Sequence, residues 1–205
     1  MPAMGHVFVR LSGFGMRLLP YWPYEFERDG ETPDRVRVTH WADASRLTAT
    51  VDSQHRESAE GIVDVSPGPE HQYWRAETGI YGFTWPDGFV IGVSVDANDP
   101  TPFYLFGPDE ARIYPQGPFP TEKMLDAAGW TGPGQKLAAQ YHLDDIEVFE
   151  LDFEYADSPW WQTHWAFPVG AGQSLVISGQ CPAAHHDLVR NAIRHIVETL
   201  SDTQP

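Results

Sequence analysis

The sequence has one cysteine, few basic residues and no long hydrophobic run, and each shortage excludes a class of protein. Cys181 stands alone among 205 residues, so no disulfide can form within the chain and nothing indicates an oxidising compartment. No apolar run reaches the roughly 18 residues that a membrane-spanning helix needs. The apolar patch at 7–11 contains Arg10 and is not followed by a small-residue cleavage site. We therefore expect a cytoplasmic protein that does not contact membranes.

Basic residues are outnumbered, since 13 Lys and Arg stand against 29 Asp and Glu, for a formal net charge of −16. Such a surface repels nucleic acids and anionic lipid and attracts basic proteins. We therefore expect no nucleic acid partner. The acidity is compatible with a basic protein partner, or with solubility alone. Only Lys123 and Lys136 are lysines, which is typical of a GC-rich bacterial genome.

The common catalytic signatures are also missing. The chain has no G-x-S-x-G elbow, phosphate loop, dinucleotide fingerprint or H-E-x-x-H motif. This favours a non-catalytic protein with no cofactor. His185 and His186 are neighbours, so on a helix they point about 100° apart and cannot easily share a metal ion. Cys181 at a helix start could be a nucleophile, but Cys181-Pro182 fits a strand-to-helix junction, and we favour an inert thiol.

The composition is that of a globular protein, with 41% hydrophobic and 20% charged residues. Glycine and proline number 18 each, which favours short strands and turns. A chain of this length suits a single domain over 1–205, and the polar stretch 52–61 is the one place that suggests a subdivision.

Alternation and turn residues predict an α+β fold with a large twisted antiparallel sheet. The predicted hairpins join 35–39 to 47–51, and 80–84 to 90–95 through the turn Trp85-Pro86-Asp87-Gly88-Phe89. Three later strands are predicted at 146–155, 160–167 and 174–179, with a β-bulge near Phe149 where the apolar phase changes. Short helices are predicted at 121–129 and 135–141. The last helix follows Pro182 and has an apolar stripe from Leu188 to Leu200.

Acidic residues concentrate in one segment. Seven carboxylates fall between Asp144 and Asp157, and no basic residue balances them. Glu150, Asp152 and Glu154 share one strand face by period two. They form either a solvated face that discourages aggregation or a docking ladder for Arg and Lys of a partner.

Tryptophans follow this segment closely. Trp160 and Trp161 are neighbours on a strand and cannot both enter one core, so one is a candidate partner anchor unless both sheet faces are covered. The predicted partner-binding residues from both groups are Glu147, Glu150, Asp152, Glu154, Asp157, Trp160, Trp161 and His164.

The C-terminal quarter resembles the end of Mog1/PsbP-like domains. The resemblance rests on the long acidic strand, the Trp-rich strand, the strand 174–179 and the Cys181-Pro182 step into an amphipathic helix. It implies an antiparallel sheet flanked by helices and a binding or adaptor role, with no catalytic residues.

We therefore expect a non-catalytic acidic module that docks a basic protein. One version is an immunity-type inhibitor whose carboxylates cover the basic cleft of a toxin. The rival hypotheses are a small hydrolase that uses His164 or His185 with nearby carboxylates, and a small-molecule carrier whose tryptophans line a pocket.

Overall fold

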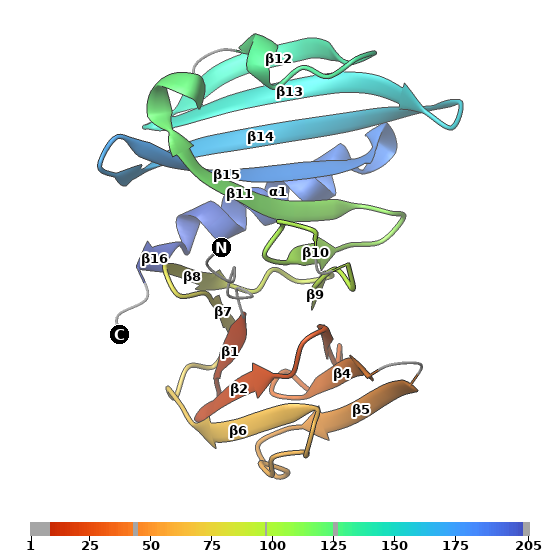
Figure 1. The fold of residues 1–205 in the computed structure, drawn as a ribbon, viewed down its shortest axis with the longest axis vertical. Helices are drawn as coiled ribbons and strands as arrows, with labels where there is room; N and C mark the ends of the chain where they lie inside the picture. The colour runs from red at the N-terminus through yellow and green to blue at the C-terminus, as the bar shows by residue number, and fades with distance from the viewer. Residues whose placement is uncertain (1–8, 43–44, 97, 125–126, 203–205) are drawn as a thin grey trace. The chain divides into compact units, whose positions relative to one another are not determined.

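The computed structural model describes residues 9–42, 45–96, 98–124 and 127–202. These divide into two compact units (Figure 1). The N-terminal unit comprises 1–105 with 194–205, and the C-terminal unit comprises 106–193. The polar stretch 52–61 lies inside the N-terminal unit, and the division falls after Leu105 instead. The expectation of a single domain stays a prediction.

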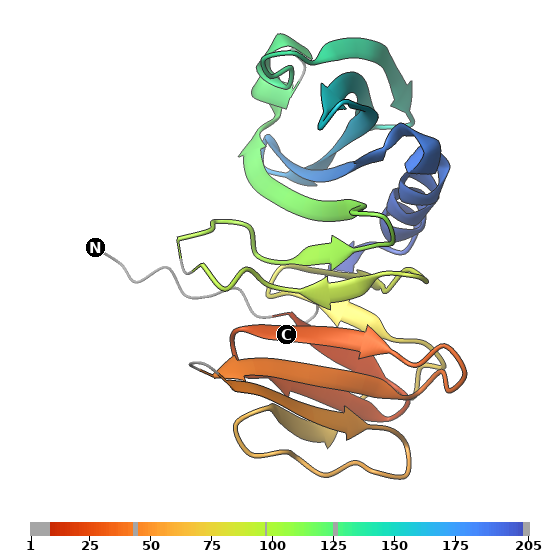
Figure 2. The same ribbon diagram turned by 90° about the vertical axis from the view of Figure 1, so that its right-hand side faces the viewer.

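The N-terminal unit contains two antiparallel sheets that lie face to face (Figure 2). The first sheet has the order β16-β8-β7-β1-β2-β6. Its strands are β1 (Arg10–Gly13), β2 (Met16–Pro20), β6 (Val63–Pro67), β7 (Arg75–Glu77), β8 (Tyr81–Thr84) and β16 (Ser201–Asp202). The second has the order β9-β3-β4-β5. Its strands are β3 (Tyr24–Arg28), β4 (Val36–Ala42), β5 (Ser45–Val51) and β9 (Val90–Gly92).

One predicted hairpin of this unit is confirmed and the other is wrong. Strands β4 and β5 pair as expected, and residues 43–44 of their turn lie outside the described residues. In contrast, β8 pairs with β7, whereas β9 pairs with β3 of the other sheet. The turn is real, but Trp85 is fully buried where the chain crosses between sheets. Local turn chemistry therefore predicts the chain reversal, but it does not determine which strands pair.

The C-terminal unit is one curved antiparallel sheet with the order β12-β13-β14-β15-β11 and helix α1 on one face (Figure 2). Its strands are β11 (Arg112–Pro120), β12 (Lys136–Leu143), β13 (Ile146–Tyr155), β14 (Ser158–Gly170) and β15 (Gln173–Pro182). The helical segments are α1 (His186–Glu198) and the single turns η1 (Thr121–Met124), η2 (Ala127–Gly129) and η3 (Ala183–His185). The boundaries of the two units fall inside two elements, after Leu105 in strand β10 (Tyr104–Phe106) and after Ile193 in α1. The predicted α+β fold, an antiparallel sheet with a C-terminal helix, is confirmed.

Three local predictions for this unit need correction. The segment expected as a helix at 135–141 is strand β12, because the edge of β13 offers it backbone partners from Ile146 to Asp152. The helix expected at 121–129 is two short 3-10 turns, with residues 125–126 outside the described residues. The bulge expected near Phe149 is not in β13, which pairs with β14 without a shift; the irregularity lies in the neighbouring strand β12, between Leu137 and Ala139, opposite Leu151 and Glu150. Both faces of β13 are covered, so Val148 and Phe149 are equally buried and the apolar phase does not switch.

Helix α1 packs directly on β15. A Cβ atom built on Gly179 would lie 2.5 Å from Cγ1 of Val189 and 2.7 Å from Cδ1 of Ile193. Glycine is therefore required for this close approach of strand and helix. The contact also identifies the face of β15 that carries Gly179 as the helix-covered face.

We expect Gly179→Ala to lower the free energy of unfolding by about 1–3 kcal/mol, because an added methyl group overpacks the contact between β15 and α1. Urea unfolding measures this loss. Gly129→Ala is the matched control, since a Cβ there meets nothing within 4 Å. Equal unfolding midpoints for the two variants would contradict the packing described.

Candidate functional site

The register of the C-terminal sheet assigns each candidate residue to one of two faces. Thr163 pairs with Gly179, and Glu150 pairs with Thr163, so Glu150 lies on the helix-covered face. His164 pairs with Ser178 and lies on the opposite face. Because side chains alternate along a strand, Asp152 and Glu154 share the face of Glu150, whereas Glu147 lies on the face of His164.

Glu150 is bound inside the protein. It is buried, and its carboxylate accepts hydrogen bonds from Nε of Arg190 at 3.2 Å, Nη2 of Arg190 at 3.1 Å and the hydroxyl of Tyr141 at 2.7 Å. The guanidinium of Arg190 also lies 5.2 Å from the ring centre of Trp161. Glu150 is thus neutralised by a residue of α1 and offers no free charge to a partner.

Glu147 is also engaged within the sheet. It is buried, accepts a hydrogen bond from the Gln140 amide at 2.8 Å and contacts Nε2 of His142. The exposed carboxylates of the acidic segment are therefore those at its two ends, Asp144 and Asp145 at the start and Asp152, Glu154 and Asp157 toward the end.

Both tryptophans of the pair are buried, at 8% exposure for Trp160 and 5% for Trp161. Trp161 lies under α1, with its ring centre 6.0 Å from that of His186. Trp160 lies on the other face and meets Tyr155 edge-on at 5.4 Å. Both sheet faces are covered here, so neither tryptophan stands exposed as an anchor.

His164 belongs to a buried polar chain and not to the acidic surface. Its Nδ1 donates to Oγ of Ser178 at 2.7 Å, because the Ser178 hydroxyl itself donates to the Gln116 amide oxygen at 2.7 Å. The Trp130 ring lies 4.7 Å away, and Nε2 of His164 has no hydrogen-bond partner. Burial lowers the pKa of His164 to about 4, so the ring is neutral at pH 7.

A recess with carboxylates in its lining, which the sequence did not predict, lies at the hairpin between β13 and β14. It has a volume of about 330 Å³ and lies beside the turn that precedes β11. Its lining residues are Asp109, Glu110, Tyr155, Ala156, Ser158, Trp160 and Pro182. We call this set the acidic recess.

Two tight turns shape the acidic recess. Ala156 and Asp157 both have positive φ, at 51° and 60°, as a two-residue hairpin turn requires. Asp109 and Glu110 also have positive φ, at 52° and 65°. More than 40 residues separate the two turns in the sequence, and no local pattern predicts that they meet.

The hydrolase alternative depends on His164 or His185 with a nearby carboxylate. His185 lies 3.2 Å from Asp109, but both side chains are partly exposed, at 38% and 63%. Burial raises the pKa of Cys181 to about 11, so the thiol is protonated at neutral pH and is a poor nucleophile. Within the described ranges, no group of three or more His, Cys, Asp or Glu could hold a metal ion.

Comparison with known proteins gives a likeness of fold. No family model and no curated protein matches the chain. The crystal structure of LpqN, involved in cell envelope biogenesis of Mycobacterium tuberculosis, matches with a TM-score of 0.43 and 16% identity, covering 60% of this chain and 83% of LpqN. The solution structure of PsbP from Synechocystis sp. PCC 6803 matches with a TM-score of 0.37 and 11% identity, covering 60% of this chain and 86% of PsbP.

The PsbP match agrees with the resemblance that the sequence indicates. It concerns fold alone. A search of the described helices finds none long and apolar enough to cross a membrane.

Removing Arg190 should destabilise the protein by roughly 3–5 kcal/mol, because Glu150 would remain buried and unpaired. Urea unfolding of Arg190→Met measures the loss, and Glu150→Leu combined with Arg190→Met should recover part of it. Arg194→Met, on an exposed position of the same helix, is the control. An unaltered midpoint for Arg190→Met would show that the ion pair is not needed.

The buried His164 predicts a loss of stability in acid. The ordinary pKa of 6.5 applies to the unfolded chain, and the folded value is about 4, so the unfolded chain binds the proton first as pH falls. The contribution of the neutral His164 ring to the free energy of unfolding is fully present above pH 6.5 and is lost as pH falls toward 4. It amounts to about 3 kcal/mol. Between pH 7.5 and pH 4.5, the free energy of unfolding should fall less for the His164→Gln variant than for the native protein. Identical losses for the two proteins would contradict a depressed His164 pKa.

Proposed function

We propose that this protein is a non-catalytic module that binds a basic protein partner, and that the acidic recess receives an Arg or Lys side chain of that partner. The observation that carries the proposal is the meeting of carboxylates and aromatic rings in one recess. Asp109 and Glu110 come from one turn, and Tyr155 and Trp160 come from the β13–β14 hairpin.

The carboxylates of the recess and of the adjoining hairpin have no Arg or Lys counterion, although Asp109 lies 3.2 Å from Nε2 of His185. In the described part of the chain, no Arg or Lys forms an ion pair with Asp109, Glu110, Glu154 or Asp157. Glu150, in contrast, has Arg190. Like charges that remain unpaired raise the local negative potential and favour an incoming cation.

The aromatic rings add a second reason for a cationic side chain. Tyr155 is 58% exposed, an unusual state for a large ring, and it is held edge-on against Trp160. A guanidinium or ammonium group over a tyrosine or tryptophan face is stabilised by about 0.5–1 kcal/mol at an exposed site. Carboxylates beside the ring strengthen the preference, and Arg gains more because it pairs with carboxylates through two hydrogen bonds.

The charge of the whole chain supports fast association with such a partner. At −16, the protein attracts a basic protein from a distance, and this attraction weakens as salt rises. We propose a cytoplasmic setting, with an immunity-type inhibitor that covers the basic cleft of a toxin as the specific form. An adaptor is the other form, and loss of the partner's own activity on binding separates the two.

The triple variant Asp109→Asn, Glu110→Gln, Asp157→Asn should lose the partner, because it removes the charge of both carboxylates of the recess and of Asp157 in the adjoining turn. We expect native protein used as bait at low and moderate salt to capture a basic protein, identified by mass. The triple variant should bind that protein at least tenfold more weakly, with a shallower dependence on salt.

A control triple variant makes the same change in net charge elsewhere. Glu57→Gln, Glu60→Gln and Asp145→Asn alter exposed carboxylates outside the recess. Equal binding by both triple variants would mean that overall charge, and not the acidic recess, holds the partner.

A further inference from the structure

The second sheet of the N-terminal unit ends in an unprotected edge. The end strands of the described sheets are β16, β6, β12 and β5. Edge strands invite pairing with other chains, and proteins prevent it with short strands, bulges, lysine, proline or a covering segment. Strand β16 has two residues, and β12 contains Lys136 and a register shift. Strand β6 is covered, since the hydroxyl of Ser58 accepts a hydrogen bond from the N–H of Val65 at 2.8 Å.

Strand β5 has none of these protections. Its seven residues pair with β4 in one unbroken register, and they include no proline, lysine or carboxylate. Its one charged residue is Arg46, whose guanidinium lies 6.0 Å from the ring centre of Trp41 and so on the β4 side. In the described part of the chain, no strand pairs with the other side of β5. That side is an open edge.

One hydrogen bond shows which backbone groups face this open edge. The N–H of Trp41 donates to the carbonyl of Pro23 at 3.1 Å, so Trp41 turns its backbone groups toward β3. These directions alternate along a strand, and two residues that face each other turn either toward or away from one another. Arg46 faces Trp41 and therefore turns its N–H and C=O to the open edge, as do Thr48 and Thr50.

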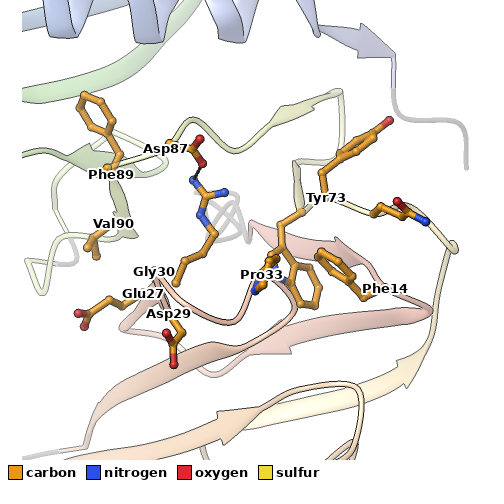
Figure 3. A pocket seen from close by; sticks show the side chains of 13 residues that line it. Phe14, Glu27, Asp29, Gly30, Pro33, Tyr73, Asp87, Phe89 and Val90 are labelled. Carbon is orange, nitrogen blue, oxygen red and sulfur yellow. Dashed lines mark ion pairs between the residues drawn. The ribbon is translucent and has the colours of Figure 1, made fainter.

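Charged side chains near this edge already have partners within the chain. The charges that line the pocket in Figure 3 are joined in the pairs Arg28–Asp87, Asp29–Arg35 and Glu27–Arg37. This pocket therefore selects no ligand by charge. Strands β4 and β5 contain two arginines and no carboxylate. The edge thus lacks the like charges through which a net charge of −16 keeps copies of the chain apart.

We propose that β5 pairs antiparallel with β5 of a second copy, about a two-fold axis at Thr48. In this register Thr48 faces Thr48 of the other copy and Arg46 faces Thr50, so no like charges are opposed. All seven residues find a partner, and any other register pairs fewer. The outward residues of the two copies exchange about six hydrogen bonds. Leu47, which is 40% exposed, is covered by Ala49 of the other copy.

This pairing makes a weak and closed dimer. One strand pair covers less than the roughly 1,200–2,000 Å² of a stable interface. Each copy uses its β5 edge once, so growth stops at two chains. Because each copy carries −16, salt screens the repulsion between them and strengthens the dimer. Binding of the basic partner proposed above weakens with salt, so the two associations respond to salt in opposite directions.

Sedimentation of the full chain at micromolar to millimolar concentration, at low and high salt, tests the dimer. We expect monomers at the lowest concentration and dimers at the highest, with more dimer at high salt. Amide NMR over the same range tests the register. The N–H signals of Arg46, Thr48 and Thr50 should shift with concentration, whereas those of Leu47 and Ala49, which already face β4, should shift less.

Two variants link the dimer to the edge. Thr48→Lys places two ammonium groups opposite each other at the two-fold axis and should weaken the dimer about fivefold. Thr48 is exposed, so the fold of each copy should be unchanged. Gln72→Lys is the matched control, with the same change in charge at an exposed position outside β5.

Three results would overturn the proposal. The first is a monomer at every concentration and salt, as expected if the edge receives an extended segment of a different protein. The second is a species larger than a dimer. The third is equal self-association of the Thr48→Lys and Gln72→Lys variants, which would place the contact elsewhere on the chain.

Discussion

The ion pair between Glu150 and Arg190 determines which part of the acidic segment can act on a partner. Two hydrogen bonds join the carboxylate to the guanidinium, and the guanidinium also covers the ring of Trp161. The pair anchors α1 on the sheet and removes Glu150 from the surface. Exposed carboxylates of the segment remain at its start, Asp144 and Asp145, and toward the β13–β14 hairpin, where the second turn adds Asp109 and Glu110.

The same pairing explains why the proposed docking surface is small. An exposed row of three carboxylates along β13 would have been a broad surface, but one of them is internal and Glu147 faces the other way. The structure instead combines two short turns into a recess with aromatic walls. A recess of this kind selects a single cationic side chain, whereas a row of charges attracts any basic surface.

Much of the C-terminal unit was predictable, because β13, β14 and β15 are long strands with clear limits in the sequence. The sequence also predicted the strand-to-helix junction at Cys181 and Pro182. Strand partners were not predictable in the N-terminal unit, where the turn after Trp85 connects two different sheets. The acidic recess could not be found either, because Asp109 and Tyr155 are more than 40 residues apart in the sequence and line one recess only in the folded chain.

The central claim is that a basic partner is recognised at the acidic recess. Mapping amide NMR shifts of the full chain during titration with a hexa-arginine peptide tests it most directly, with a hexaglutamate peptide as reference. The account predicts saturable shifts concentrated at residues 109–110 and 154–158. Shifts of similar size at exposed carboxylates throughout the chain, such as Glu57 and Asp145, would contradict it.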